Sequence, residues 1–249
     1  MLWRMSAASG LLFAALLAAA YVLGGPMPPA GTPPDRLVAF VSAHSQTQEW
    51  SWFLTSGPAL LTGPSFLGAL ASKLWESDPA ARYLTAAAFA NALVAGALLA
   101  AAGIAWGLLV YLATQITSPS LILVLAESRH FAEGAVSFPA AGAVIGFSLA
   151  ARHSLRGWQL VALLGALAAG LQLANGLDDF VVDGVTGPIG PAAFCALLAW
   201  IAAASFSLAG EQRLRWHERR RSTPQTHQPR SPILTHARPD STGQIASDA

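Results

Sequence analysis

The side chains that could bind a metal or act as acids and bases lie between the long apolar stretches of the chain. They are His44, Glu49, Glu127, His130, Glu133, Asp178, Asp179 and Asp183. Carboxylates and imidazoles can hold a divalent metal, and a bound metal can activate water. His130 and Glu133 are three residues apart, so a helix would place both on one face. No H-E-x-x-H or comparable spacing occurs, so we interpret these residues as solvated acidic segments. The alternative is a metal-dependent enzyme centred on Glu49, Glu133, Asp178 and Asp179.

The apolar stretches carry neutral polar side chains, namely Asn91, Gln159, Gln172 and Asn175, and almost no ionisable ones. Buried charges mark proton relays and ion paths in membrane proteins, so their scarcity argues against a pump or an ion channel. Asn91 could form an interhelical hydrogen bond with Gln172, worth roughly 0.6–2 kcal/mol. The alternative is a site for a small neutral or apolar ligand formed by Asn91, Gln172 and a helix kink at Pro58.

Other motifs with known chemistry are missing from the sequence. It has no glycine-rich phosphate loop, no Ser-His-Asp order and no C-x-x-C pair, and its one cysteine, Cys195, is expected to be a small core residue. The sequence therefore predicts no catalytic residue, no resident metal and no cofactor.

The composition indicates the class of fold that must position these side chains. The chain has 249 residues, of which 54% are hydrophobic and 11% charged, against about 25% charged in a typical soluble domain. Of its charged residues, 11 lie in 211–249 alone. A disordered chain, a nucleic-acid-binding module and an ordinary soluble enzyme are excluded. The pattern predicts an all-α, polytopic transmembrane helical bundle with short loops.

A helix needs about 20 mainly apolar residues to cross a bilayer. Six stretches qualify, at about 8–23, 52–74, 84–113, 134–151, 158–173 and 191–208. The second contains Gly57-Pro58 and Gly63-Pro64, and each proline removes a backbone donor. We expect that helix to persist in lipid with a kink and freed carbonyls near Leu54 and Leu60.

The basic residues predict the orientation, since cytoplasmic segments are enriched in Lys and Arg. Counted from the N-terminus, the first, third, fifth and seventh segments outside the predicted spans hold 12 of the 14 basic residues. The second, fourth and sixth hold two basic and seven acidic residues. Six spans with both termini in the cytoplasm reproduce this alternation. Only one of the basic residues is lysine, which indicates a GC-rich genome. We expect the protein to lie in a bacterial plasma membrane. Residues 1–25 could instead be a cleaved signal, which would leave five spans.

Several segments outside the spans have a pattern of their own. An apolar stripe after Asp35 predicts an amphipathic surface helix on the outer side, and Leu121–Ala126 a second one after Ser118-Pro119. Beyond a membrane domain over 1–210, residues 211–221 predict a basic helical extension. Its arginines, within Arg213–Arg221, would each gain about 1 kcal/mol from anionic lipid headgroups. Beyond Ser222 the tail is predicted to be disordered.

Two glycine pairs match the G-x-x-x-G pattern that lets helices approach closely, Gly103/Gly107 and Gly142/Gly146. We expect packing within the chain at both pairs. The alternative is a homo-oligomer formed through one of them.

Five short segments together resemble one protein family. They are Gly24-Gly25-Pro26; Asp35-Arg36-Leu37-Val38-Ala39-Phe40 followed by His44; Phe66-Leu67-Gly68-Ala69-Leu70; Leu84 to Ala90; and Leu155-Arg156-Gly157-Trp158. Over about residues 8–208 the chain resembles the uncharacterised multi-pass membrane proteins of high-GC actinobacteria. It departs from that pattern at the Gly-Pro pairs, at Gly157 and in its long tail. The resemblance implies a multi-span topology and no particular activity.

The sequence thus predicts a non-enzymatic integral membrane protein whose partners are lipids and not nucleic acid. The alternatives are a transporter or binding protein for a small neutral or apolar ligand, and the metal-dependent enzyme on the outer face.

Overall fold

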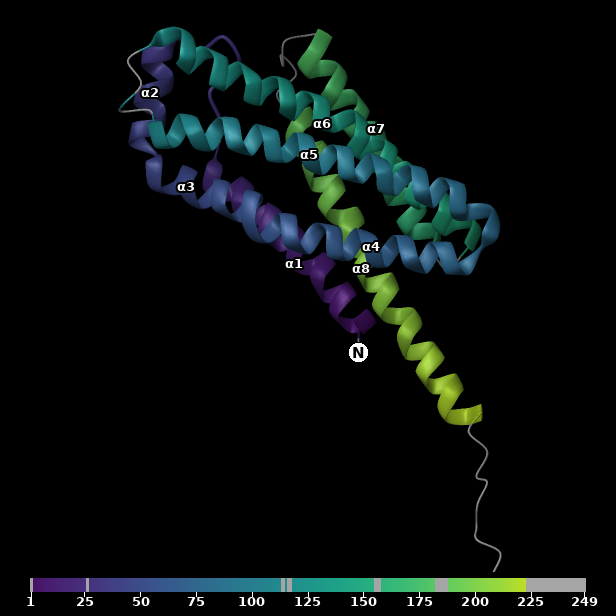
Figure 1. Cartoon of the computed structure of the whole chain (residues 1–249). Helices are drawn as coiled ribbons and strands as arrows, with labels where there is room; N and C mark the ends of the chain where they lie inside the picture. The colour runs from purple at the N-terminus through teal and green to yellow at the C-terminus, as the bar shows by residue number, and fades with distance from the viewer. Residues whose placement is uncertain are drawn as a thin grey trace, which may run out of the picture. The chain divides into compact units, whose positions relative to one another are not determined.

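A computed structural model of the chain describes residues 2–25, 27–112, 115, 118–154, 158–181 and 188–222. Within these residues every regular element is helical, so the all-α prediction is confirmed (Figure 1). In chain order the elements are α1 (Leu2–Gly24), α2 (Pro34–Ala43), α3 (Ser45–Leu54), η1 (Thr55–Ala59), α4 (Leu60–Ser77), η2 (Pro79–Ala81), α5 (Arg82–Leu112), α6 (Pro119–Ser154), α7 (Gln159–Val181) and α8 (Ile189–Ser222). The chain divides into two compact units, Met1–Arg213 and Leu214–Ala249, and the packing described below is within the first.

Five helical stretches among the described residues are long and apolar enough to cross a membrane. They are Ser6–Gly24, Pro79–Leu112, Pro119–Arg152, Gln159–Phe180 and Ile189–Gly210. The remaining predicted span, 52–74, coincides with α3, η1 and α4. It is not one of the five, because α3 has only 10 residues and the 18 residues of α4, with Lys73, Glu76 and several small polar residues, are not apolar enough.

The Gly57-Pro58 step lies in η1, which is a π-helical turn of five residues. Proline has no N–H to donate to the carbonyl four residues back, so the regular α-helical ladder cannot continue unchanged past Pro58. Two hydroxyl groups near this turn also bond to backbone carbonyls. Thr55 Oγ1 donates to the Ser51 carbonyl and Thr62 Oγ1 to the Pro58 carbonyl, both at 2.9 Å. The predicted disturbance of the helix is therefore a π turn within an otherwise continuous helical segment.

The main apolar core lies between α1, α4, α5, α6, α7 and α8. Its largest fully buried side chains include Trp200, Phe66 and Phe147. Trp200 of α8 donates its Nε1–H to Ser148 Oγ of α6 at 3.0 Å, and Gly165 of α7 leaves the room that the Ser148 side chain occupies. This buried hydrogen bond thus joins α6 to α8 at a point where α7 has no side chain.

A second, smaller core lies where α2 meets the C-terminal end of α5 and the N-terminal end of α6. Its buried residues are Leu37, Val41, Trp106, Leu109, Val110, Ile122 and Ala126. We call this the α2 end of the structure, and the opposite end, where η2 joins α4 to α5, the η2 end. The predicted amphipathic helix is present as α2, and its buried apolar residues pack on protein.

Two further expectations need correction. The sequence predicts a separate surface helix over Leu121–Ala126 and a span that begins at residue 134, but α6 is one helix from Pro119 to Ser154. No glycine or proline interrupts residues 120–133, so the helix has no reason to break there. Cys195, expected in the core, is exposed on α8. The helix predicted over 211–221 is present as the last turns of α8, whereas the predicted disorder and headgroup contacts concern residues or side chains outside those described.

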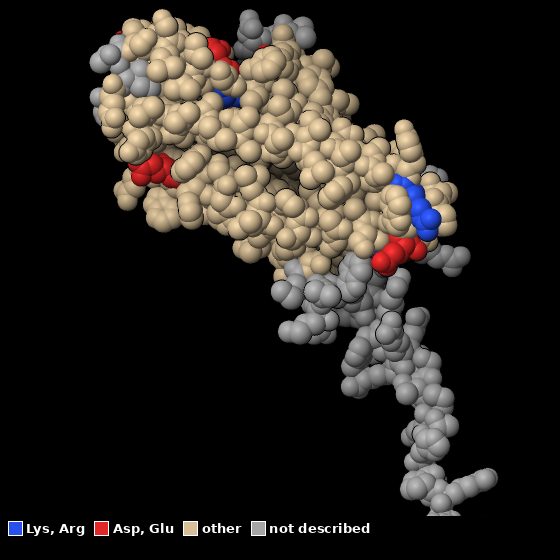
Figure 2. All heavy atoms as spheres, in the orientation of Figure 1, with Lys and Arg blue, Asp and Glu red and all other residues tan. Residues whose placement is uncertain are grey.

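The charged side chains are unevenly placed. On the face drawn in Figure 2 they form groups near the two ends of the helices, separated by a wide uncharged band. Such a band is what lipid tails require of the surface that they contact.

Candidate functional site

A buried amide fixes α3 against its neighbours at the α2 end. The Gln48 side chain is 0% exposed. Its Nε2 donates to the Gly24 carbonyl at the end of α1 at 2.7 Å, and its Oε1 accepts from Trp106 Nε1 of α5 at 2.9 Å. Ser51, one turn later, donates its hydroxyl to the Ala20 carbonyl at 2.8 Å. Polar groups of α1, α3 and α5 are thereby paired in an apolar setting, where an unpaired group would be costly.

The same tryptophan carries a buried cation. The Arg129 guanidinium of α6 lies 4.2 Å from the centre of the Trp106 ring, and its Nη2 is 2.8 Å from Glu133 Oε1. Arg129 is only 8% exposed, although its place between apolar stretches suggested a solvated loop. A guanidinium can be buried when it stacks on an aromatic face and pairs with a carboxylate. Gln48, Trp106, Arg129 and Glu133 therefore form one polar network joining α3, α5 and α6.

Replacing Arg129 with methionine is expected to lower the free energy of unfolding by about 2 kcal/mol, because Trp106 loses its stacked cation and Glu133 its partner. Unfolding of the purified protein in mixed micelles, followed by tryptophan fluorescence, measures the loss. Arg82→Met is the matched control: Arg82 is exposed and its guanidinium lies 5.7 Å from the Trp75 ring. An equal loss in both variants would contradict a special role for the buried pair.

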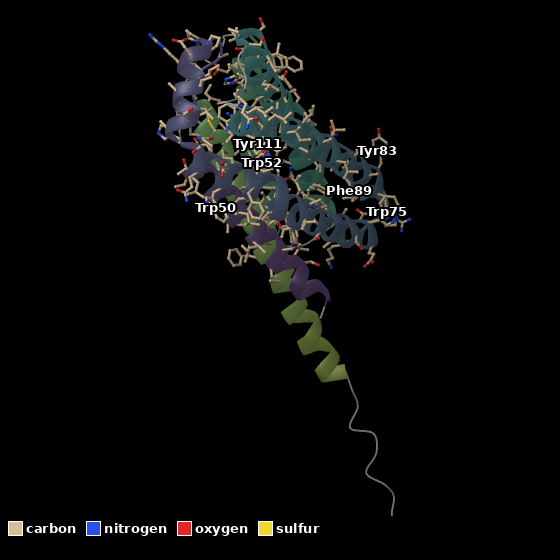
Figure 3. All side chains as sticks on the ribbon, turned by 60° about the vertical axis from the view of Figure 1, so that its left-hand side comes forward. Trp50, Trp52, Trp75, Tyr83, Phe89 and Tyr111 are labelled. Atoms are coloured by element: carbon tan, nitrogen blue, oxygen red, sulfur yellow. The ribbon has the colours of Figure 1, made fainter. Side chains whose placement is uncertain are left out.

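An apolar groove of about 790 Å³ lies between α3 and α5 at the α2 end. Its lining residues are Gln46, Glu49, Trp50, Trp52, Phe53, Ile104, Gly107, Leu108, Val110 and Tyr111. The Trp52 indole rests against Gly107, where an added Cβ would come within 2.8 Å of the ring. Figure 3 shows Trp50, Trp52 and Tyr111 near one another at this end. We call this cavity the α3–α5 groove; its volume is typical of sites for small molecules.

A smaller cavity of about 360 Å³ lies between α4 and α5 toward the η2 end. Trp75 and Phe89, labelled in Figure 3, contribute to its lining with Thr85 and small or aliphatic residues. No charged side chain belongs to the lining described for it.

The predicted acidic group comes together only in part: Asp179 lies within electrostatic range of Asp178, Glu133 and His130, whereas Glu49 lies in the α3–α5 groove. Glu133 pairs with Arg129, Glu127 accepts the Gly31 N–H at 2.9 Å, and Asp179 accepts from Asn175 at 3.2 Å. Glu49 lines the α3–α5 groove, and Asp178 is buried on α7. Among the residues that the structure describes, no three His, Cys, Asp or Glu side chains are placed to hold a metal; Asp183 lies outside them.

The predicted ligand-binding residues make separate contacts. Asn91 donates to the Ala87 carbonyl of its own helix at 3.0 Å, and Gln172 donates to the Ala193 carbonyl of α8 at 3.4 Å. Neither of these is the Asn91–Gln172 hydrogen bond that the sequence suggested. Pro58 lies in η1, and none of these three residues lines either cavity described above.

Both glycine pairs are used within the chain. Gly103 and Gly107 face Ser56 and Trp52, while Gly142 and Gly146 face Asn91 and Ala88. The expected packing within the chain is confirmed at both pairs.

Sequence reasoning missed the α3–α5 groove and the buried network. The i,i+4 spacing of Arg129 and Glu133 was a signal for a helical ion pair, and it was available in the sequence. Nothing in the sequence paired Gln48 with Trp106, because their contact depends on how α3 packs on α5.

The chain was compared with known protein families, curated proteins and solved structures, and no significant match was found in any of the three.

Proposed function

We propose that this chain is an integral membrane protein that crosses the plasma membrane of a bacterium six times, with both termini in the cytoplasm. The five membrane-length helices supply five crossings. The helical segment from Ser45 to Ser77 supplies the sixth. The bacterial setting follows from the resemblance to multi-pass proteins of actinobacteria.

The observation that carries the sixth crossing is the position of exposed aromatic side chains. Trp50 and Tyr111 are exposed at the α2 end, and Trp75 and Tyr83 at the η2 end (Figure 3). Along α5, Tyr83 and Tyr111 are about 42 Å apart at roughly 1.5 Å per residue. A bilayer with its headgroup regions is about 40–45 Å thick, and Trp and Tyr concentrate at its two surfaces. The segment from α3 to α4 carries the same two aromatic belts as α5, a recognised span, and we infer that it crosses beside it.

The orientation follows from charge, with the α2 end outside. The predicted outer segments hold seven acidic and two basic residues, whereas Lys73 and Arg82 lie at the η2 end. The basic segment Arg213–Arg221 would then meet anionic headgroups of the inner leaflet.

The packing of α1 supports its retention as a span. Gly10 lies against Phe66 and Ser205, and the Gly24 carbonyl accepts from Gln48. Loss of α1 by cleavage would leave the Phe66 ring and the Gln48 amide without these neighbours.

We further propose a non-enzymatic role, in which the protein binds an apolar molecule taken from the lipid. The α3–α5 groove supports this role, since its lining is dominated by aromatic and aliphatic side chains. The groove takes the place of the site expected at Asn91, Gln172 and Pro58.

Cysteine accessibility tests the six-span topology. In a Cys195→Ser background, Ala39→Cys on α2 and Ala80→Cys in η2 each place one thiol at an exposed position. A membrane-impermeant maleimide added to intact cells is expected to label Ala39→Cys at least tenfold more than Ala80→Cys. After lysis the two should be labelled equally.

Labelling of both thiols from the outside would place the two ends of the Ser45–Ser77 segment on one side, and five spans would replace six. Labelling of Ala80→Cys alone would reverse the orientation. A permeant maleimide serves as the control that both thiols are reactive.

A further inference from the structure

We propose that the α3–α5 groove holds one lipid of the outer leaflet whose headgroup carries an ammonium group. The inference rests on the proposed binding role and names the class of molecule bound. It begins from the charge of the groove: Glu49 is the one charged side chain among the lining residues that the structure describes.

The side chains next to Glu49 favour a cation of a particular kind. Trp50, Trp52 and Tyr111 belong to the same lining, and aromatic faces attract ammonium groups, most strongly where water is displaced. A carboxylate beside several aromatic rings therefore selects an ammonium head over a neutral hydroxylated head, and it repels a head with net negative charge.

The buried cation at this end of the structure is already paired elsewhere. The Arg129 guanidinium lies against the Trp106 ring and is paired with Glu133. Trp106 is bonded to Gln48, which is buried and does not line the groove. Glu49 is thus left to interact with a molecule in the groove.

The rest of the lining suits an acyl chain. Ile104 and Leu108 lie on α5 at 59% and 45% exposure, and on a membrane-spanning helix such exposure means contact with lipid. The groove therefore joins an aromatic, acidic part near the expected headgroup level to an aliphatic part along α5. One bilayer lipid would enter sideways, head toward Glu49 and chain along Ile104.

Photo-crosslinking in nanodiscs tests the proposal. The full chain is placed in a phosphatidylglycerol bilayer with a trace of lipid carrying a diazirine in its acyl chain, with either an ethanolamine or a glycerol headgroup. The two probes share the phosphate and the chains and differ in the ammonium group. Labelling of peptides from α3 and α5, measured by mass spectrometry, is expected to favour the ethanolamine probe about fivefold.

Three variants complete the design. Glu49→Gln is expected to reduce the preference to about onefold, while Asp35→Asn, which removes an exposed acid from the same end, leaves it unchanged. Ile104→Trp fills the aliphatic part and is expected to lower labelling by both probes.

Equal labelling of the wild-type protein by the two probes would overturn the headgroup assignment while leaving an apolar binding groove. Absence of labelling on α3 and α5 would overturn both the headgroup assignment and the binding role. An equal loss of preference in Asp35→Asn would reduce the effect to general surface charge.

Discussion

Replacing Gln48 with leucine is expected to lower the free energy of unfolding by about 3 kcal/mol. The substitution introduces an apolar side chain of similar size and leaves the Trp106 N–H and the Gly24 carbonyl without partners. Each buried group left unpaired costs about 1–3 kcal/mol. In detergent, the midpoint of thermal unfolding reports the loss, and it should fall well below that of the wild-type protein.

Gln46→Leu is the matched control for this experiment, since Gln46 is the same residue type on the same helix and is exposed. Its free energy of unfolding should stay within about 0.5 kcal/mol of the wild-type value. Similar midpoints for the two variants would show that the Gln48 side chain does not hold α1, α3 and α5 together.

The second large effect is expected for Gly146→Ala. A methyl group there would lie 2.8 Å from the Ala88 Cβ and 3.3 Å from the Ala88 Cα, where α6 packs on α5. The neighbour is partly backbone and cannot rotate away, so α5 and α6 must separate. Overpacking of this kind costs about 1–3 kcal/mol, and we expect about 2 kcal/mol from unfolding in mixed micelles.

Gly96, on the neighbouring helix α5, provides the control for the Gly146→Ala substitution. Gly96 has nothing within 4 Å of an added Cβ, so Gly96→Ala should be neutral or slightly stabilising, because alanine favours the helical backbone. If Gly146→Ala were equally neutral, the close approach of α5 and α6 at this glycine would not contribute to stability.

Hydropathy and charge predicted most of the helices, because the cost of placing a side chain in lipid depends on that side chain and hardly on its neighbours. The end of α1 illustrates this: the predicted stop at Gly24-Gly25 is present, with Gly25 in the left-handed region at φ +62° and its N–H donating to the Tyr21 carbonyl. By contrast, the sequence predicts an outer segment with a short surface helix at Leu121–Ala126, whereas residues 119–133 continue α6 and pack against α2 and α5.

The candidate site was much less accessible from the sequence. Asn91 and Gln172 attracted attention as polar residues in apolar stretches, but each is satisfied by a nearby carbonyl. The α3–α5 groove depends instead on Gly107 lying beneath Trp52 and on the contact of two helices about fifty residues apart in sequence. Residue type alone does not encode which helices become neighbours, and so the cavity could be found only from the structure.

The hydrogen bond between Gln48 and Trp106 also bears on the order in which the chain is built. When the ribosome has synthesised α1 and α3, Gln48 can already donate to the Gly24 carbonyl. The Trp106 indole, which donates to the Gln48 side-chain oxygen, lies 58 residues later in the chain. Until α5 has been inserted, the side-chain oxygen of Gln48 has no indole partner in the lipid. On the proposed six-span topology, α1 and the Ser45–Ser77 segment are therefore expected to stay near the insertion machinery, or near water, until α5 arrives.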